Sequence, residues 1–202
     1  MDLPSTKIIG ITGGIGAGKS VIARIFKEMG IIVFDCDSVA KSLYNSDDTL
    51  RKFMVESYGQ SLYNTPSGKL DRALLAKILF SDPQALHKVE EQVHSRTIES
   101  FKQWVAIQHT EWCGLESAIL YKVKPLMEMC NAVVEVDAPE ALRIKRVRVR
   151  DDAPIESIKK RIAAQNITIP TNLTQPLFRI VNDDAYPLLP QVREVFQKLS
   201  QL

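Results

Sequence analysis

The chain has 202 residues, of which 45% are hydrophobic and 25% charged, and its formal net charge is +2. This is the composition of an ordinary globular protein with room for one α/β domain and a small insertion. The nearly balanced charge does not predict a nucleic-acid partner. No apolar run approaches the roughly 18 residues of a membrane span, and no signal peptide is expected before the first strand. The three cysteines share no metal-ligand spacing, so we expect reduced thiols in a cytoplasmic protein without a membrane partner.

A glycine-rich stretch near the N-terminus is the most informative part of the chain. Residues 7–20 read KIIGITGGIGAGKS, an apolar strand that leads into a turn and then a helix. From Gly13 onward the turn matches G-x-x-x-x-G-K-[ST], the phosphate-binding loop. Its backbone N–H groups and the helix N-terminus can bind an anion; Lys19 can reach the outer phosphates, and the Ser20 hydroxyl can ligate Mg²⁺. The predicted nucleotide-binding residues are Gly14, Ile15, Gly16, Ala17, Gly18, Lys19 and Ser20.

Two other interpretations of this stretch are less favoured. The glycines could serve only the geometry of a tight turn, but the strand–turn–helix context supports the phosphate loop. A dinucleotide-binding fingerprint starts at Gly16, yet Val21 stands where its third glycine belongs.

Two carboxylates follow the second predicted strand. Residues 31–34 are apolar and lead to Asp35 and Asp37. Ligands of open α/β sheets bind at the carboxyl ends of the strands, so the pair is a candidate for catalysis beside a phosphate loop. The structural alternative is that one of the two caps a helix beginning near Ser38, a common role of Asp.

Residues 38–110 predict helices and no convincing buried strand. This segment is interpreted as a helical insert that could form a wall of the substrate site. Asp71 and Arg72 open one of its helices, and Arg72 could bind an anion or pair with an acid on the surface. His87 and His94 share a helical face, but nothing acidic or thiol-bearing clearly completes a metal site, so packing or surface roles are favoured.

Three further strands are predicted at residues 114–120, 132–136 and 178–181, and a closing helix at residues 187–202. Because strands alternate with helices, the sheet should be parallel and covered on both faces. Asp137 follows the fourth strand and could either assist Mg²⁺ or cap the next helix. The helix-start pattern after it favours the cap.

A basic helix follows the fourth strand. Arg143, Arg146 and Arg150 fall on one face of it, at spacings i, i+3 and i+7. A phosphate would relieve their repulsion and suit a bidentate guanidinium; the alternative is a solvated basic face neutralised by nearby acids. A second helix at residues 155–165 follows a sharp turn, and the two would make a movable lid.

Together these features are the parts of a phosphoryl-transfer enzyme for a small acceptor. Lys19 and Mg²⁺ would hold the donor phosphates, and arginines would balance the charge of the transferring group. In a loose transition state the proton moves late, so Asp37 could orient the acceptor hydroxyl and take its proton without a strongly raised pKa.

Four segments carry a resemblance to a known family. They are residues 11–20, Asp35-Cys36-Asp37, Leu70-Asp71-Arg72, and the stretch from Lys145-Arg146 through Arg150-Asp151-Asp152 to Ala164-Gln165. In this order they resemble the dephospho-CoA kinase family of the P-loop nucleoside and nucleotide kinases. The resemblance implies ATP- and Mg²⁺-dependent phosphorylation of the ribose 3′-hydroxyl of dephospho-coenzyme A, the last step of coenzyme A synthesis.

The resemblance also implies residue roles. Asp37 matches the catalytic acid of the family, and Arg146 and Arg150 match lid arginines that close over ATP. Asp37, Arg72 and His94 are assigned to the acceptor site. Lys19 joins the catalytic group as the lysine of the phosphate loop.

The implied fold class is α/β, a three-layer P-loop kinase fold with a parallel five-stranded sheet, a helical substrate-binding insert and a small helical lid. Residues 1–37, 112–145 and 169–202 would form the nucleotide-binding core. Residues 38–111 would form the acceptor insert and residues 146–168 the lid. We expect a monomer or a weak homo-oligomer.

Three stretches depart from the family pattern. His94-Ser95 stands for the usual His-Pro, and residues 118–122 for a Pro-Leu-Leu before an acid. Residues 179–184 replace Ala-Asp and Asn-Gly, which leaves the adenine contact unassigned. The rival functions are a kinase of another nucleoside or nucleotide and an inactive nucleotide-binding scaffold. A GTPase switch is excluded because neither D-x-x-G nor [NT]-K-x-D occurs.

Overall fold

The structure is a computed structural model that describes residues 6–165 and 168–202. The chain divides into two compact units. The first, called the core unit below, takes the chain up to Asp35 and again from Val105 onward. The second, called the helical unit, is Cys36–Trp104.

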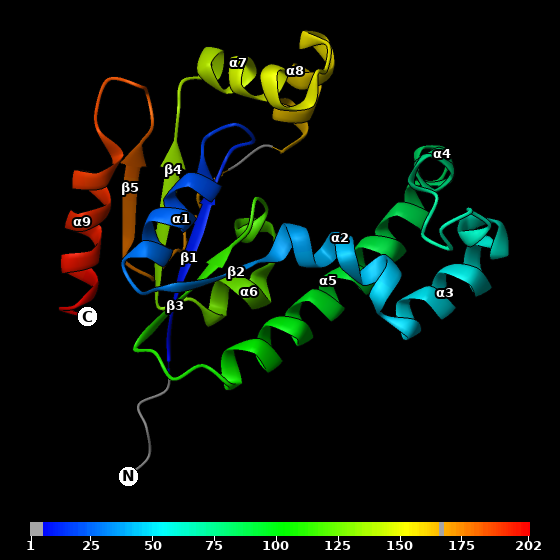
Figure 1. Ribbon diagram of the computed structural model, residues 1–202, viewed down its shortest axis with the longest axis horizontal. Helices are drawn as coiled ribbons and strands as arrows, with labels where there is room; N and C mark the ends of the chain where they lie inside the picture. The colour runs from blue at the N-terminus through cyan, green and yellow to red at the C-terminus, as the bar shows by residue number, and fades with distance from the viewer. Residues whose placement is uncertain (1–5, 166–167) are drawn as a thin grey trace. The chain divides into compact units, whose positions relative to one another are not determined.

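The core unit is built on a five-stranded sheet whose strand pairs are all parallel, in the order β2-β3-β1-β4-β5 (Figure 1). The strands are β1 (Lys7–Gly13), β2 (Ile32–Asp35), β3 (Trp112–Glu116), β4 (Ala132–Asp137) and β5 (Leu177–Val181). The predicted parallel five-stranded sheet is confirmed. Because the strands are parallel, all their carboxyl ends lie at one edge, called the carboxyl edge below, and their amino ends at the opposite, amino edge.

The third strand is shorter than predicted. It ends at Glu116 instead of residue 120, because the chain turns away after Ser117, whose hydroxyl accepts a hydrogen bond from the Ile119 N–H at 3.3 Å. The apolar residues that suggested a longer strand include Leu120, which is buried in a short 3₁₀ turn, Leu120–Lys122. An apolar run does not by itself distinguish a strand from a buried turn.

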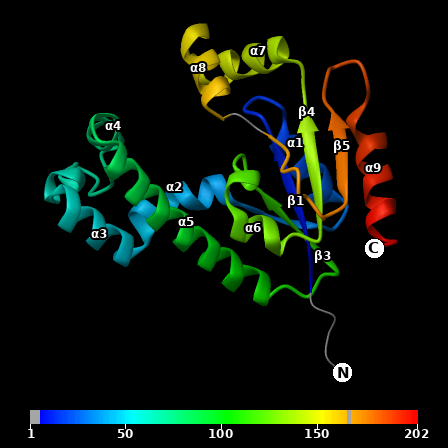
Figure 2. The ribbon, with the colours of Figure 1, turned by 180° about the vertical axis from the view of Figure 1, so that it is seen from behind.

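Helices cover both faces of the sheet. α1 (Lys19–Glu28) and α9 (Leu188–Leu199) lie on one face and α6 (Lys124–Met129) on the other (Figures 1 and 2). Ile22 and Phe26 of α1 are fully buried, which contributes roughly 1.5–3 kcal/mol each to folding. The sequence did not predict α6, since six residues are too few for a helical period to show.

Two further helices of the core unit follow β4 beyond the carboxyl edge (Figure 1). They are α7 (Glu140–Asp151) and α8 (Ile155–Gln165). Pro139 occupies the N-cap position of α7 and supplies no side-chain bond, so the prediction that Asp137 caps this helix is wrong. Asp137 instead ends β4, where its carbonyl accepts from the Asn182 N–H at 2.8 Å.

The helical unit has a core of its own. Its elements are α2 (Cys36–Ser46), α3 (Asp48–Tyr58), the 3₁₀ turn Gln60–Tyr63, α4 (Arg72–Ser81) and α5 (Pro83–Ala106), whose last residues pass into the core unit. Leu50, Met54 and Leu62 are fully buried at its centre. Asp71 caps α4 by accepting from the Leu74 N–H at 2.9 Å, which confirms that Asp71 and Arg72 open a helix.

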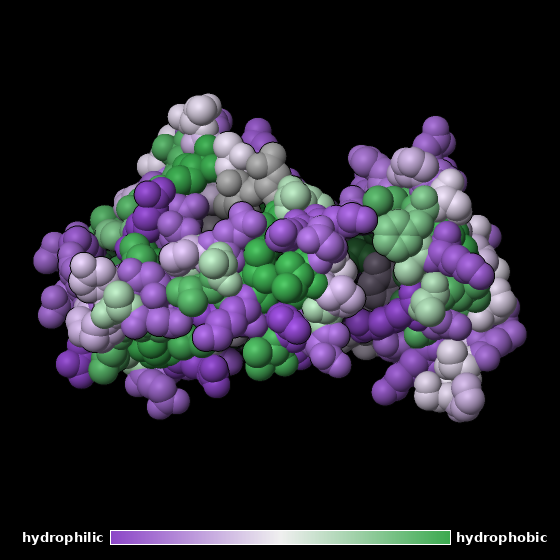
Figure 3. All heavy atoms as spheres, turned by 90° about the horizontal axis from the view of Figure 1, so that it is seen from above, coloured by the Kyte–Doolittle hydropathy of each residue, from purple (hydrophilic) through white to green (hydrophobic). Residues whose placement is uncertain are grey.

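The predicted helical character of residues 38–110 is confirmed within this unit. The expected functional division into core, insert and lid stays a prediction, and of the predicted lid, Asn166 and Ile167 lie outside the described residues. No helix of the described chain is both long and apolar enough to cross a bilayer. The surface seen in Figure 3 mixes hydrophilic and hydrophobic residues.

Candidate active site

The glycine-rich turn after β1 packs too closely against α7 and against Asn182, the residue after β5, to accept larger residues. Gly16 has a φ of +79°, and a Cβ there would lie 2.6 Å from the Arg143 carbonyl oxygen. Gly18 has a φ of +100°, and a Cβ there would overlap the amide of Asn182. Glycine therefore serves two needs at these positions: a left-handed backbone and the close approach of neighbouring groups.

Lys19 begins α1 directly after the turn. Its ammonium group donates to the Gly13 carbonyl at 3.0 Å, so the side chain folds back over the turn. The N-cap of α1 is Gly18, which has no side chain to accept from the first N–H groups. These N–H groups and the helix dipole present positive charge on the same side as the Lys19 ammonium, which suits a phosphate.

Ser20 is bonded to a buried carboxylate from the neighbouring strand. Its hydroxyl donates to Glu116 Oε1 at 3.0 Å, and Glu116 is only 6% exposed. Glu116 is the last residue of β3, which pairs with β1 through Ile11. The sheet therefore fixes a hydroxyl oxygen and a carboxylate oxygen next to each other at the carboxyl edge.

Two arginines of α7 hold the turn from the other side. Arg143 Nε donates to the Ile15 carbonyl at 3.0 Å, and one guanidinium nitrogen of Arg146 lies 3.5 Å from the Gly16 carbonyl. A Cβ on Gly14 would overlap the Arg143 guanidinium. Of the predicted arginine face of this helix, Arg143 and Arg146 thus contact the phosphate loop.

Asn182, which follows β5, connects these parts. It is 8% exposed; its amide donates to the Ala17 carbonyl at 2.8 Å, and its Oδ1 accepts from Arg146 at 3.1 Å. Asp184 also accepts from Arg146, at 2.6 Å. Arg146 is therefore fixed between the phosphate loop and the segment that follows β5.

The end of α8 also reaches the loop. Gln165 Oε1 accepts from the Ile15 N–H at 2.6 Å, and its Nε2 donates to the Ala118 carbonyl at 2.9 Å. One amide side chain thus bridges the predicted lid, the phosphate loop and the segment after β3. A phosphate that takes the Ile15 N–H would replace the Gln165 oxygen as its acceptor.

Arg150, the third member of the arginine face, is paired inside the lid. It donates to both carboxylate oxygens of Asp151, at 2.6 and 3.1 Å, and Arg161 donates to the same carboxylate at 2.7 Å. Hydrogen bonds from Arg150 and Arg161 hold the pKa of Asp151 well below its usual range. Asp151 is therefore shared between one arginine of α7 and one of α8.

A pocket of about 310 Å³ lies on α7, next to Arg146. Leu142 and Val149 form its apolar walls, and Lys145, Arg150 and Asp184 its polar rim. Val149 is 82% exposed. Arg146 lines this pocket and also approaches the phosphate loop, so the pocket lies next to the loop.

The predicted acceptor residues belong to the helical unit. Asp37 lies in the first turn of α2, which begins at Cys36, so it follows the end of β2 by two residues. Arg72, the first residue of α4, is exposed and donates to the Lys41 carbonyl at 3.3 Å. His94 is half-buried in α5. Their roles in acceptor binding stay predictions.

The residues present fit Mg²⁺ better than a transition metal. Within residues 6–165 and 168–202 no group of three or more His, Cys, Asp or Glu side chains could hold a metal ion. Mg²⁺ does not need such a group, because it binds through one or two protein oxygens together with water and phosphate oxygens. The adjacent oxygens of Ser20 and Glu116 meet that requirement.

Three residues of this site received no role from the sequence as donor-site groups: Glu116, Asn182 and Gln165. Arg143 was named only as part of the arginine face that could bind a phosphate. Glu116 could have been found as the acidic residue that ends an apolar strand. Asn182 and Gln165 gave no such signal, since their bonds join segments more than 140 residues apart.

Comparisons with known proteins agree with this geometry. Residues 7–183 match the family model described as dephospho-CoA kinase. A dephospho-CoA kinase of Bacteroides fragilis is 35% identical over 194 residues, covering 96% of this chain and 93% of its own. One of Porphyromonas gingivalis is 34% identical, covering 94% and 92%.

Solved structures show the same architecture. The protein TT1252 from Thermus thermophilus superposes with a TM-score of 0.74 at 26% identity, with 98% of both chains covered. Dephospho-CoA kinase from Campylobacter jejuni superposes with a TM-score of 0.67 at 23% identity, covering 96% and 97%, a likeness of fold. With the family match spanning residues 7–183, this chain belongs to the dephospho-CoA kinase family, and it is a kinase with an α/β P-loop fold.

Proposed function

We propose that this chain transfers the γ-phosphoryl group of ATP to the ribose 3′-hydroxyl of dephospho-coenzyme A and thereby forms coenzyme A and ADP. The observation that carries the proposal is the loop from Gly13 to Ser20, held between Glu116 of β3 and two arginines of α7 in a chain of this family. A loop of this kind binds the phosphates of the donor, and membership of the family indicates dephospho-CoA as the acceptor.

The donor phosphates would bind over the turn, at the N-terminus of α1. The Lys19 ammonium would contact the outer phosphates, where it lowers the cost of charge that develops on the transferring group. The Ile15 N–H, which now donates to Gln165, is one of the backbone donors available to a phosphate oxygen. Arg146 would add positive charge from α7.

Mg²⁺ would be held by the Ser20 hydroxyl together with phosphate oxygens, and Glu116 would orient that hydroxyl or share the hydration shell of the ion. When bound, the ion neutralises charge on the β- and γ-phosphates. The buried position of Glu116 suits this role, because a carboxylate in a low-dielectric site interacts more strongly with a nearby cation.

The adenine base would occupy the pocket on α7. Leu142 and Val149 offer apolar contact to a planar ring, and the guanidinium of Arg146 can stack on it. Asp184 holds that guanidinium in place at 2.6 Å. The sequence left the adenine contact unassigned because residues 179–184 depart from the family pattern, and this pocket is the proposed contact.

Asp37 would orient the acceptor hydroxyl and accept its proton as the new bond forms. Arg72 and His94 of the helical unit would contact the acceptor, since an exposed arginine at the start of a helix suits its phosphate groups. Arg150 would leave or share its pair with Asp151 to reach the transferring phosphate.

The deciding experiment compares phosphorylation rates on dephospho-CoA, AMP and uridine at saturating ATP and Mg²⁺. We expect kcat/KM to be highest for dephospho-CoA, and an equal or higher value for AMP or uridine would overturn the proposal. In parallel, Asp37→Asn should lower kcat by about 10²–10⁴-fold while ATP binding survives. If the chain were an inactive nucleotide-binding scaffold, neither the wild type nor Asp37→Asn would show turnover.

A further inference from the structure

We propose that Gln165 is a positioning residue that competes with the donor for the phosphate loop, because its side-chain oxygen occupies a backbone N–H of the loop until a phosphate takes it. The inference rests on the proposed function, which places the donor phosphates over this loop. Gln165 is the last residue of α8, and its Oε1 accepts from the Ile15 N–H at 2.6 Å. Ile15 is the third residue of the loop motif that begins at Gly13.

The Gln165 amide is bonded at both ends, which fixes the end that faces the loop. A backbone N–H can only donate and a carbonyl oxygen can only accept. The amide oxygen must therefore face the Ile15 N–H, and the amide nitrogen must face the Ala118 carbonyl, 2.9 Å away. The opposite orientation would bring two donors together and two acceptors together. Gln165 thus presents an oxygen to the loop, as a phosphate would.

The Ile15 N–H is held from outside the loop, unlike that of Ala17. The Ala17 N–H donates to the Gly14 carbonyl at 2.9 Å, a bond that belongs to the turn itself. The Ile15 carbonyl accepts from Arg143 Nε at 3.0 Å, so both backbone groups of Ile15 are bonded to the helices that follow β4. The backbone of Ile15 is therefore a point at which α7 and α8 both hold the loop.

A phosphate oxygen should displace the glutamine. A hydrogen bond to a charged oxygen is about twice as strong as one between neutral groups, and a phosphate also gains from the N-terminus of α1. The displaced Gln165 oxygen can be solvated, because the side chain is only half-buried. The donor therefore wins the exchange, but its affinity is lowered by the free energy of the bond that it replaces, an effect of about two- to tenfold.

Displacement would also release the end of α8 from the loop. A second bond of this helix end, from Lys122 Nζ to the Ala164 carbonyl at 3.4 Å, joins α8 to the 3₁₀ turn after β3 and does not involve the loop. Of these two bonding side chains, only Gln165 contacts a group that a phosphate also needs. Gln165 thus couples occupation of the loop to the contacts of α8.

Calorimetric titration with the Mg²⁺ complex of AMP-PNP, an ATP analogue that resists hydrolysis, tests the competition without any acceptor. Gln165→Ala frees the Ile15 N–H and should lower the Kd about two- to tenfold. Gln165→Glu keeps the size of the side chain and an acceptor at Ile15 but adds a negative charge, so the Kd should rise about tenfold or more. A merely structural role would weaken binding in both variants.

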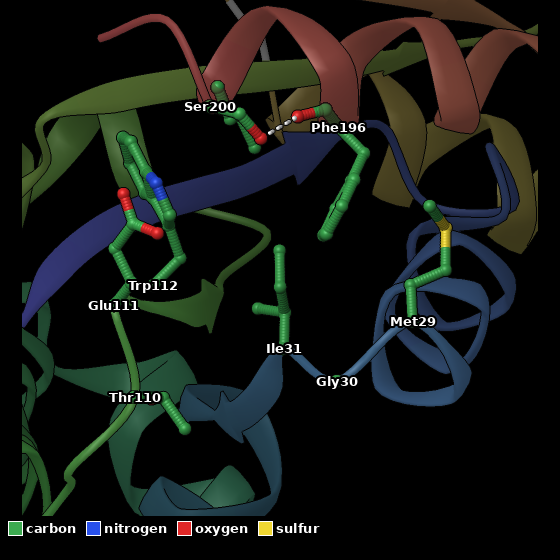
Figure 4. A pocket seen from close by; sticks show the side chains of 9 residues that line it. Met29, Gly30, Ile31, Thr110, Glu111, Trp112, Phe196 and Ser200 are labelled. Carbon is green, nitrogen blue, oxygen red and sulfur yellow. Dashed lines mark hydrogen bonds between the residues drawn. The ribbon is translucent and has the colours of Figure 1, made fainter.

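Two control variants separate competition from a general loosening of the fold. Lys122→Ala removes the other bond of the α8 end and leaves the Ile15 N–H occupied, so it should not tighten binding. Ser200→Ala removes a hydroxyl that donates to the Phe196 carbonyl at 3.2 Å, beside Trp112 at the amino edge of the sheet (Figure 4). Its Kd should equal that of the wild type.

If Gln165→Ala does not fold, Gln165→Leu replaces it with the same expectation, because leucine keeps more of the packing and cannot accept a hydrogen bond. The inference is overturned if this variant binds the analogue no more tightly than the wild type, if Gln165→Glu tightens binding, or if Lys122→Ala tightens it equally. Each of these outcomes leaves the proposed function standing. A wild type that does not bind the analogue would overturn both.

Discussion

The two edges of the central sheet treat their polar groups in opposite ways. At the carboxyl edge, Ser20 is bonded to Glu116, and Asn182 bridges Ala17 and Arg146, so the loop is held by segments from across the chain. At the amino edge, Trp112 Nε1 is buried without a partner in the described chain, beside a cavity. One helix, α1, connects both edges.

At the carboxyl edge, hydrogen bonds fix the polar groups in place before any ligand binds. The carboxyl edge needs groups fixed in the positions that a charged ligand requires, because preorganised dipoles cost nothing to reorient during the reaction. The sheet and α7 hold these groups in place, and as a result the loop glycines cannot be replaced by larger residues. At the amino edge, by contrast, the buried Trp112 N–H has no partner among the described residues, which costs folding free energy.

Between the two edges, the largest effect is expected at the carboxyl edge, from Lys19. Lys19→Ala should lower kcat/KM by about 10²–10³-fold, because a preorganised positive charge on the transferring phosphates is lost. A coupled assay of ADP formation measures it. Lys198→Ala, which removes a lysine paired with Glu194 in the last turn of α9, is the matched control and should keep full turnover. Equal losses in both variants would refute a special role for Lys19.

The next effect concerns the metal. Glu116→Gln keeps the size of the side chain and removes its charge, so the Mg²⁺ concentration for half-maximal rate should rise about 10–100-fold. The rate measured against Mg²⁺ concentration checks this, with Glu194→Gln on the surface of α9 as control. An unchanged Mg²⁺ dependence in Glu116→Gln would mean that this carboxylate serves only to position Ser20.

A pair of glycines compares the two edges directly. Gly16 and Gly30 both have positive φ, +79° and +92°, so alanine at either should cost about 1–2 kcal/mol of backbone strain. A Cβ at Gly30 meets nothing within 4 Å, whereas one at Gly16 lies 2.6 Å from the Arg143 carbonyl oxygen. Gly16→Ala should therefore be less stable than Gly30→Ala by at least about 1 kcal/mol in urea unfolding. Equal losses would show that α7 can move away from the loop.

The smallest effect lies in the lid. Arg150 and Arg161 lower the pKa of Asp151 from its ordinary 3.8, so the pair stabilises the fold fully above about pH 4. The contribution is lost as the pH falls from there through the folded-state pKa. These partners are largely exposed, so Asp151→Asn should cost at most about 1 kcal/mol at pH 7.

Thermal unfolding of wild type and Asp151→Asn at pH 7 and pH 3 measures this effect. The difference in Tm should shrink at pH 3. A difference that grows as the pH falls would contradict the ion pair as its cause.

The fold was predictable because its elements are locally encoded. Strands β2, β4 and β5 were placed to within one residue at each end, and β1 extends two residues past the apolar run that predicted it, since apolar runs bounded by turns mark buried parallel strands. The short helix α6 and the early end of β3 were not predicted. Both depend on packing over Gly10, where Leu120 and Cys130 fill the space that a side chain would take.

The candidate site was predictable only in part. The loop from Gly13 to Ser20 and the arginine face of α7 were visible as spacing patterns. The prediction that Asp137 caps α7 was wrong, because Pro139 takes that position. Arg150 was placed on the correct helix, and the structure adds that Asp151 holds it.

By itself, the sequence determined the phosphate loop, the parallel sheet and the family, because each depends on residue types at short, fixed spacing. Only the tertiary structure decided which groups surround the loop. Glu116, Arg143, Gln165 and Asn182 meet there because parallel strands bring their carboxyl ends to one edge, whatever the distance between them in the chain. The amino-edge cavity arises in the same way, since the ends of α1, β3 and α9 come together only when the sheet is formed.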